Sequence, residues 1–233
     1  MPLIVTPYSQ IDPRWKDKKM SPSNLTMGDY GCLVTCEAMI VSNYALDRLE
    51  PDGDITPGEL CDRVITNGGF GTDGNEDGMV LNKVWKQMYW LERVYTTNFP
   101  DKDTSRMEIN VALRRIKRLI ALGQPVILHV DYPNDNDAVH RPDHFIVCYS
   151  SGWDCIDAYD GRRLKLPERY GIPEKAIFGY LAYIGPAIGY EDTGDSAAGS
   201  AAWKLSQVLK KMSINDPNRQ YVKEALDILI YTG

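Results

Sequence analysis

The stretch Asp29-Tyr30-Gly31-Cys32-Leu33-Val34-Thr35-Cys36-Glu37-Ala38-Met39-Ile40-Val41 decides how this chain folds and where its chemistry can lie. A glycine turn leads directly into an apolar segment with helical periodicity, which predicts a buried helix from Cys32 to about Tyr44–Leu46. Cys32 then stands at a helix N-terminus, where unpaired N–H groups and the helix dipole favour a thiolate over a thiol. The alternative is a small buried residue of a core helix, the usual role of a free cysteine.

Capping signals and apolar periodicity predict three more helices before residue 125. Thr56-Pro57-Gly58-Glu59 combines a threonine N-cap, a proline in the first turn and a glutamate three residues after the cap. A helix therefore begins there and ends at Gly68-Gly69. The spacing of apolar side chains predicts the other two helices over residues 79–90 and 107–122.

The character of the sequence changes after Gly123. Segments rich in Val, Ile, Tyr and Phe, separated by turn residues, are typical of strands, and Ser151-Gly152 is typical of a tight hairpin. The predicted strands cover residues 125–130, 145–149, 153–156 and 177–184. Helices followed by an antiparallel sheet indicate an α+β domain.

The chain divides into a main domain over residues 1–187, a linker over 188–201 and a C-terminal helical appendage over 202–233. The linker is rich in Gly, Ala, Ser, Asp and Glu, and Asp216-Pro217 separates two short amphipathic helices beyond it. Helices this short are not stable alone in water. We expect them to dock on the main domain, on a second copy in a homodimer, or on a target.

Composition excludes several classes of function. A formal net charge of −6 argues against nucleic-acid binding. The basic cluster Arg114, Arg115, Lys117 and Arg118 alternates with apolar residues, as on the solvated face of an amphipathic helix. No apolar stretch is long enough to span a membrane, and the N-terminus lacks the basic region of a signal peptide. Five cysteines without a small-domain framework indicate synthesis in the reducing cytoplasm, with later release by another route left open.

His144 and Asp157 are the candidate partners of Cys32. Of the three histidines, His144 stands at the first position of a predicted strand, which is a rigid mount for a general base. Asp157 follows the next strand, 13 residues on, so a hairpin at Ser151-Gly152 brings the two toward each other. A carboxylate there can hold the imidazole in one tautomer and orientation. The alternative is a strand-end histidine near an unrelated turn aspartate.

Four motifs in this order resemble a known family. They are Tyr8-Ser9-Gln10-Ile11-Asp12-Pro13-Arg14-Trp15, Gly28-Asp29-Tyr30-Gly31-Cys32-Leu33-Val34-Thr35, His144-Phe145-Ile146-Val147 and Asp157-Ala158-Tyr159-Asp160-Gly161. Together they resemble the papain-fold cysteine peptidases related to the bacteriocin-processing, double-glycine type, and most closely the stand-alone relatives from bacteria and bacteriophages. The resemblance covers roughly residues 4–185 and leaves the C-terminal helices unexplained.

The resemblance implies a papain-like fold and a role for each site residue. Cys32 would attack the carbonyl, His144 would take the thiol proton, Asp157 would orient His144, and Gln10 would support the oxyanion. The chain departs from the family in two places. The family often has Asp-Pro where this chain has Asp157-Ala158, which leaves Asp154 and Asp160 open as the third member. Papain-like enzymes carry the glutamine about six residues before the cysteine, where this chain has Thr26, whereas Gln10 lies 22 positions upstream.

Metal and cofactor sites are not predicted. Asp73-Gly74-Asn75-Glu76-Asp77-Gly78 matches the first half of a calcium loop, but Val84 stands where the bidentate glutamate belongs. His140 and His144 with Asp143 or Cys148 lack a recognised zinc spacing, and Cys32 with Cys36 would need two more ligands. The remaining cysteines are interpreted as core residues: Cys36, Cys61, Cys148 and Cys155. Of these, Cys148 and Cys155 could face each other across the hairpin.

The favoured hypothesis is a cysteine peptidase or amidase that works through a thioester intermediate. The resemblance suggests the peptide bonds of bacterial peptidoglycan as substrate, as for phage endolysins, with the enzyme released to the cell wall or carried in a virion. Leader-peptide export is excluded because the transporter's membrane segments are absent. Two alternatives stay open: an acyl transferase that uses the same thioester, and a catalytically silent papain-like binding or structural module.

Overall fold

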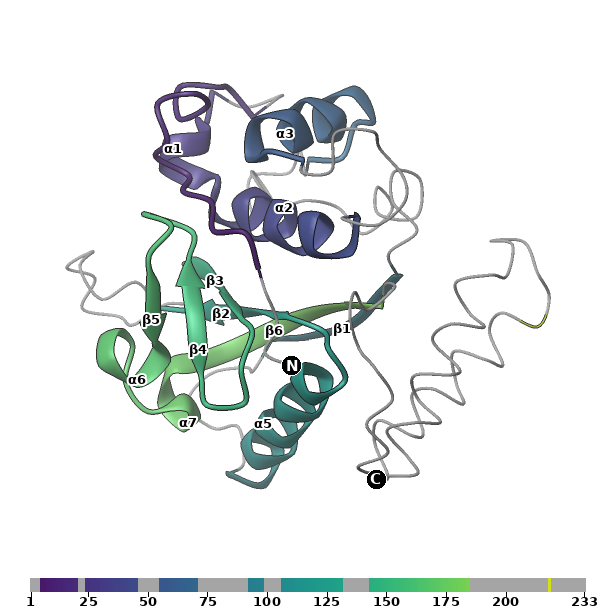
Figure 1. Ribbon diagram of the computed structural model, residues 1–233, viewed down its shortest axis with the longest axis vertical. Coiled ribbons are helices and arrows are strands. Elements are labelled where there is room, and N and C mark those ends of the chain that lie inside the picture. The colour runs from purple at the N-terminus through teal and green to yellow at the C-terminus, as the bar shows by residue number, and fades with distance from the viewer. Residues whose placement is uncertain are drawn as a thin grey trace.

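Figure 1 shows the computed structural model, which describes residues 5–20, 24–45, 55–70, 92–98, 106–131, 143–184 and Asn218. The described residues form a mixed α+β structure, as the sequence predicts. Its centre is a six-stranded sheet in the order β1-β6-β2-β3-β4-β5, in which every neighbouring pair is antiparallel.

The helices and strands have the following bounds. The described helices are α1 (Met27–Tyr30), α2 (Cys32–Ala45), α3 (Pro57–Thr66), α5 (Arg106–Ala121), α6 (Leu166–Arg169) and α7 (Pro173–Ala176). The described strands are β1 (Glu92–Asn98), β2 (Val126–Val130), β3 (His144–Cys148), β4 (Asp154–Asp157), β5 (Arg163–Lys165) and β6 (Ile177–Ile184).

The longer elements match the predictions closely. The helices predicted from Cys32, from Thr56 and over 107–122 are α2, α3 and α5, and the four predicted strands are β2, β3, β4 and β6. The predicted capping box is present, because the Thr56 side chain accepts from the Glu59 N–H and the Glu59 side chain accepts from the Thr56 N–H. The hairpin at Ser151-Gly152 is also present. The structure adds α1, β1, β5, α6 and α7, which the sequence analysis missed.

Some predictions fall outside the described residues. These are the helix over 79–90, the calcium-like sequence from Asp73 to Val84, the linker over 188–201 and the C-terminal helices, of which only Asn218 is described. The division of the chain after residue 187 therefore stays a prediction.

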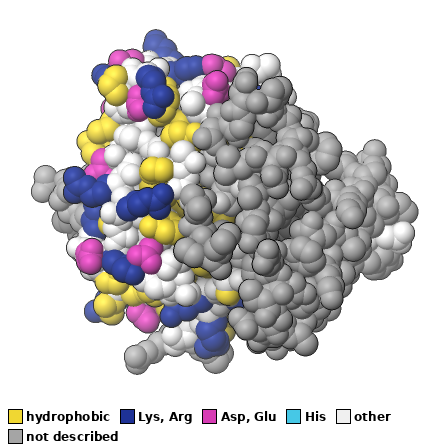
Figure 2. Space-filling model, viewed as in Figure 1, with side chains coloured by type: hydrophobic (Ala, Val, Ile, Leu, Met, Phe, Trp, Pro, Cys, Tyr) yellow, Lys and Arg dark blue, Asp and Glu magenta, His cyan; other side chains and the backbone are white. Residues whose placement is uncertain are grey.

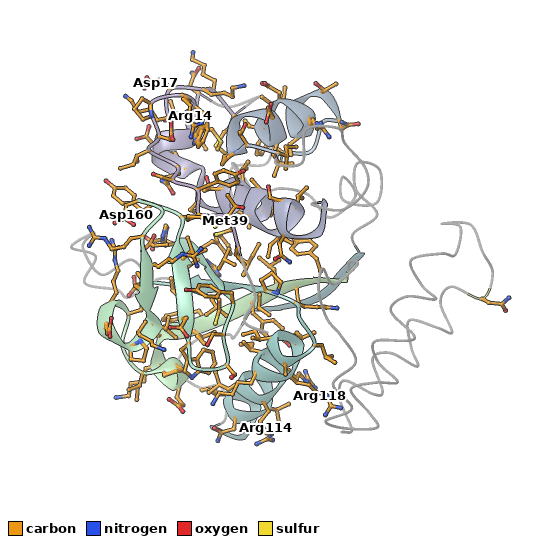
Figure 3. All side chains as sticks on the ribbon, in the orientation of Figure 1. Arg14, Asp17, Met39, Arg114, Arg118 and Asp160 are labelled. Carbon is orange, nitrogen blue, oxygen red and sulfur yellow. The ribbon has the colours of Figure 1, made fainter. Side chains whose placement is uncertain are left out.

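Side chains on the two faces of the sheet belong to two separate cores. Ile127, Phe145, Val147, Ile156 and Leu181 pack with α2 and α3, and Figure 3 shows Met39 of α2 on the side of that helix that faces the sheet. The alternate residues pack with α5 instead: Val126, Leu128, Ile146, Cys148, Cys155 and Tyr180. Helices on both sides of the sheet (Figure 1) explain why these strands are apolar at nearly every position.

Helix α5 is amphipathic, as predicted. Leu113, Ile116 and Leu119 are buried against the sheet, whereas Arg114 is exposed, and Arg114 and Arg118 lie on the side of α5 away from the sheet in Figure 3. On the described part of the face in Figure 2, Lys and Arg side chains are interspersed with Asp and Glu.

Gly31 sets the point at which α2 begins. Its N–H donates to Met27 O at 2.8 Å, which closes α1, and its carbonyl accepts from the Thr35 N–H at 2.9 Å, which opens α2. A Cβ at Gly31 would lie 2.3 Å from Met27 O, closer than any side chain tolerates. The sharp step from α1 to α2 thus requires glycine, and it makes Cys32 the first residue of the long helix.

We expect Gly31→Ala to destabilise the protein by about 1–3 kcal/mol, because the added methyl group overlaps backbone that cannot rotate away. Gly152→Ala is the matched control, since its Cβ would meet only the ends of side chains, the nearest being the Ser150 Oγ at 3.3 Å. Urea unfolding of both variants measures the difference. Equal stability of the two variants would contradict this account of the α1–α2 step.

Candidate active site

The structure brings Cys32, His144 and Asp157 together from three elements. Cys32 is the first residue of α2, His144 the first residue of β3, and Asp157 the last residue of β4. His144 Nε2 lies 2.8 Å from Asp157 Oδ1, and the His144 side chain also hydrogen-bonds the Cys32 side chain. Because Nε2 of His144 contacts Asp157, Nδ1 is the ring nitrogen that can contact the Cys32 sulfur. A thiol, an imidazole and a carboxylate thus form one continuous chain of contacts.

Strand pairing accounts for the contact between His144 and Asp157. Ile146 of β3 pairs directly with Asp157 of β4, so His144 and Asp157 are diagonal neighbours in the antiparallel ladder. Side chains at such diagonal positions lie within reach of each other when one of them is long or aromatic. Helix α2 packs on β3, which brings its N-terminal residue to the same region.

Asp157 is a buried anion with donors on both of its oxygens. Its exposed fraction is 0%. Oδ1 accepts from His144 and from the Tyr159 N–H at 2.9 Å, while Oδ2 accepts from Tyr170 Oη at 2.5 Å and lies 3.0 Å from Arg169 Nη1. Burial raises the pKa of Asp157, but the hydrogen bonds from His144, Tyr170 and Tyr159 outweigh it, so the net effect lowers the pKa. The carboxylate is therefore charged at neutral pH.

His144 is protonated at neutral pH in this environment. Burial lowers its pKa, but the hydrogen bond that His144 donates to Asp157 and the hydrogen bond and charge interaction with Cys32 more than compensate and raise the pKa to about 9. An imidazolium beside a cysteine favours the thiolate form of the sulfur through charge attraction. The arrangement places the positive charge of His144 beside the Cys32 sulfur, with Asp157 on the Nε2 side of the ring.

The two other aspartates considered for the third position have different partners. Asp154 forms an ion pair with Lys165 at 2.7 Å. Asp160, in the turn between β4 and β5 (Figure 3), lies 3.3 Å from Arg169 and accepts from the Arg162 N–H. Among these three carboxylates, the contact with His144 belongs to Asp157.

Gln10 lies between the segments that carry Cys32 and Asp157. Its backbone N–H donates to Ala158 O at 2.7 Å, and its side-chain Nε2 donates to Gly28 O at 2.8 Å. The side chain is buried at 4% exposure. Thr26, which occupies the position of the glutamine in papain-like enzymes, instead caps α1 by accepting from the Asp29 N–H.

The start of α2 supplies further donors. Thr35 is the first residue whose N–H reaches back to the carbonyl of the Gly31 turn. The N–H groups of Cys32, Leu33 and Val34 therefore have no acceptor within α2. They stand beside the sulfur, where a negative charge on a reacting oxygen can be stabilised.

The other four cysteines are buried, as predicted. All five thiols are free. Burial raises the pKa of Cys36 and Cys155 well above the ordinary value and that of Cys61 to about 11. Cys148 pairs with Cys155 across the hairpin, as expected. Cys32 differs from these four cysteines in its neighbour, since among the thiols of the described structure it alone has the His144 ring beside it.

Within the residues that the structure describes, there is no group of three or more His, Cys, Asp or Glu side chains placed to hold a metal ion. In the same residues, no helix is both long and apolar enough to cross a membrane.

Comparisons of the chain with protein-family models, with curated proteins and with solved structures found no match. The functional argument therefore rests on the geometry of the site and on the motifs in the sequence.

Tyr170 and Arg169 were missed by the sequence analysis. A helix signal precedes them, because Pro167 stands in the first turn of α6 and Gly171, at φ 93°, follows its end. That signal predicts a short helix. It carries no information about the contact with Asp157, which depends on how α6 folds back onto β4.

The raised pKa of His144 makes its contribution to stability dependent on pH. The folded state holds the proton more tightly than the unfolded chain, so this contribution is complete below pH 6.5 and is lost as pH rises through about 9. Comparing wild type with His144→Gln by urea unfolding from pH 6 to 9.5, we expect the difference in unfolding free energy to shrink by roughly 3 kcal/mol. A difference that is constant over this window would show that His144 is not held as an imidazolium.

Proposed function

We propose that this protein is a cysteine peptidase or amidase of papain-like fold, which hydrolyses peptide bonds through a thioester on Cys32. One observation carries the proposal: the His144 ring contacts Cys32 while its Nε2 meets the buried carboxylate of Asp157. This is the order of nucleophile, base and orienting group that acyl transfer to a thiol requires.

The proposed reaction begins with attack of the Cys32 thiolate on the carbonyl carbon. The backbone N–H of Cys32 and the side-chain amide of Gln10, whose second N–H is not used on Gly28, stabilise the oxyanion. The C–N bond then breaks, and His144 gives its proton to the departing amine. Water attacks the thioester, His144 accepts its proton, and the acid is released as Cys32 leaves.

The burial of the charged residues argues against a silent binding module. Asp157 and His144 are 0% and 5% exposed, and burying charged groups is costly unless they are paired. A module that only binds has no need for a thiol at the end of that buried pair. The transferase alternative uses the same residues and differs only in which nucleophile meets the thioester.

The substrate class rests on the sequence resemblance. The motifs are most similar to those of stand-alone bacterial and bacteriophage members of the family, which suggests the peptide bonds of the bacterial cell wall as substrate. The enzyme would reach the cell wall by release from the cell or from a virion. Peptidoglycan is therefore the first substrate to test, followed by unmodified peptides.

Selective alkylation tests the nucleophile without knowledge of the substrate. With iodoacetamide at pH 6, followed by mass spectrometry, we expect Cys32 to react at least about tenfold faster than any other cysteine, because only a thiolate is nucleophilic. His144→Ala should remove this advantage. His129→Ala is the matched control, since His129 lies on the neighbouring strand, opposite Phe145, and stacks on it. Uniform reactivity of all five thiols would refute the proposed nucleophile.

Product analysis tests the reaction itself. Wild-type protein incubated with purified peptidoglycan or with a peptide panel should generate new amino groups, and Cys32→Ala should lower that rate by at least about 10³-fold. A parallel reaction with excess glycine methyl ester separates the two acyl-transfer chemistries. Free acid as the main product supports a hydrolase. Amide adducts of glycine methyl ester as the main product would show that the protein is a transferase.

A further inference from the structure

Asp157 has two oxygens with different partners, and only one of them faces His144. Oδ1 carries the His144 contact and the Tyr159 N–H. Oδ2 is met by Tyr170 and Arg169, which follow each other at the end of α6. The fully buried carboxylate thus obtains half of its donors from this one short helix.

Helix α6 is anchored so that these two side chains meet Asp157. Leu166 is fully buried, and its N–H donates to Trp153 O at 2.9 Å, which ties α6 to the residue before β4. The Tyr170 N–H donates to Leu166 O at 2.9 Å and closes the helical turn. Arg169 and Tyr170 therefore stand on a rigid mount next to the strand that ends in Asp157.

Tyr170 contacts both members of the His144–Asp157 pair. Its hydroxyl donates to Oδ2 of Asp157, and its ring lies nearly parallel to the His144 ring, with centroids 6.4 Å apart and an interplanar angle of 19°. One side chain thereby restrains the plane of the carboxylate and the tilt of the imidazole. The side chain is half-buried, whereas His144 and Asp157 are buried.

Arg169 supports the same arrangement from the other side. Its Nη1 lies 3.0 Å from Asp157 Oδ2 and 3.3 Å from Asp160 Oδ2, so it bridges the end of β4 and the turn that follows. Its guanidinium also lies 5.9 Å from the centre of the Tyr170 ring. The charge of Asp157 is thus balanced on the side away from His144.

We infer that Tyr170 is a positioning residue of this site and acts through Asp157, with Arg169 as its support. The inference rests on the proposed function. The described contacts of Tyr170 are with the Asp157 carboxylate and the face of the His144 ring, and the scheme above assigns it no bond-making or proton-transfer step. Its hydroxyl keeps the buried carboxylate ionised and oriented, so that His144 presents a proton to the sulfur and the amine in one geometry.

The test measures how Cys32 reactivity depends on pH. Three groups face the His144–Asp157 pair and set this dependence: Cys32 on α2, and Arg169 and Tyr170 at α6. Cys36 lies near Asp157 as a buried thiol. Removing the Tyr170 hydroxyl takes a donor from the carboxylate, so the carboxylate gains a proton at higher pH. The acidic limit is the pH below which the rate of Cys32 alkylation by iodoacetamide falls to half. Tyr170→Phe should therefore move this limit upward by about one pH unit.

A double variant that combines Tyr170→Phe with Asp157→Asn tests whether Tyr170 acts through the Asp157 carboxylate. If Tyr170 acts through the carboxylate, adding Tyr170→Phe to Asp157→Asn should change the profile by less than about twofold at every pH. Tyr149→Phe, which removes a hydroxyl from a half-buried tyrosine beside β3, is the matched control and should leave the profile unchanged. Should Tyr170→Phe fail to fold, Arg169→Gln removes a donor from the same oxygen and should shift the limit in the same direction.

Two results would overturn the inference: a Tyr170→Phe profile equal to that of wild type, or the same shift in the Asp157→Asn background. Both leave the wild-type reactivity of Cys32 intact and are therefore distinct from failure of the proposed function, in which wild-type Cys32 itself lacks selective reactivity at pH 6. With a substrate in hand, Tyr170→Phe should lower kcat about fivefold and leave KM unchanged.

Discussion

The buried charge of Asp157 is the constraint on which the site depends. A carboxylate removed from water is stable only if hydrogen bonds replace its hydration. Here the donors come from β3, from the turn after β4 and from the end of α6. Each of these parts must be in place for Asp157 to stay ionised, and only an ionised Asp157 holds His144 as an imidazolium next to Cys32. The reactivity that we propose for Cys32 therefore depends on all three of these elements.

The sheet explains how such a site can be rigid. Its strands bury side chains on both faces, with α2 and α3 on one side and α5 on the other (Figure 1). A slip by one residue would move every side chain of such a strand to the opposite face and into the other core, where the close packing does not fit it. The register that pairs Ile146 with Asp157 is consequently well specified, and with it the diagonal contact to His144. The step between α1 and α2 at Gly31 fixes the position of Cys32 in a similar way, because it makes Cys32 the first residue of α2.

Elements with a strong local signal were predictable, and elements that depend on distant partners were not. Helices α2, α3 and α5 have apolar periodicity or a capping box, and β2, β3 and β6 are dense in β-branched and aromatic residues, while β4 follows the turn signal Ser151-Gly152. Strand β1, with the sequence Glu-Arg-Val-Tyr-Thr-Thr-Asn, does contain β-branched and aromatic residues, but this run of four lies between charged and polar residues, and the strand forms by pairing with β6 at the edge of the sheet. Strand β5 has only three residues and depends on β4 in the same way. Pairing between segments far apart in the chain leaves little trace in either segment.

The sequence by itself determined that Cys32 opens a buried helix, that His144 opens a strand and that Asp157 lies directly after the residues predicted for the next strand, because helix caps, glycine turns and strand composition act over a few residues. It left Asp154, Asp157 and Asp160 as alternatives and did not reveal Tyr170 or Arg169. Only the tertiary structure decided which carboxylate meets the imidazole and which side chains cover its second oxygen. The reason is physical: a hydrogen bond about 3 Å long depends on strand register and on the packing of α6, and neither is a property of any local segment.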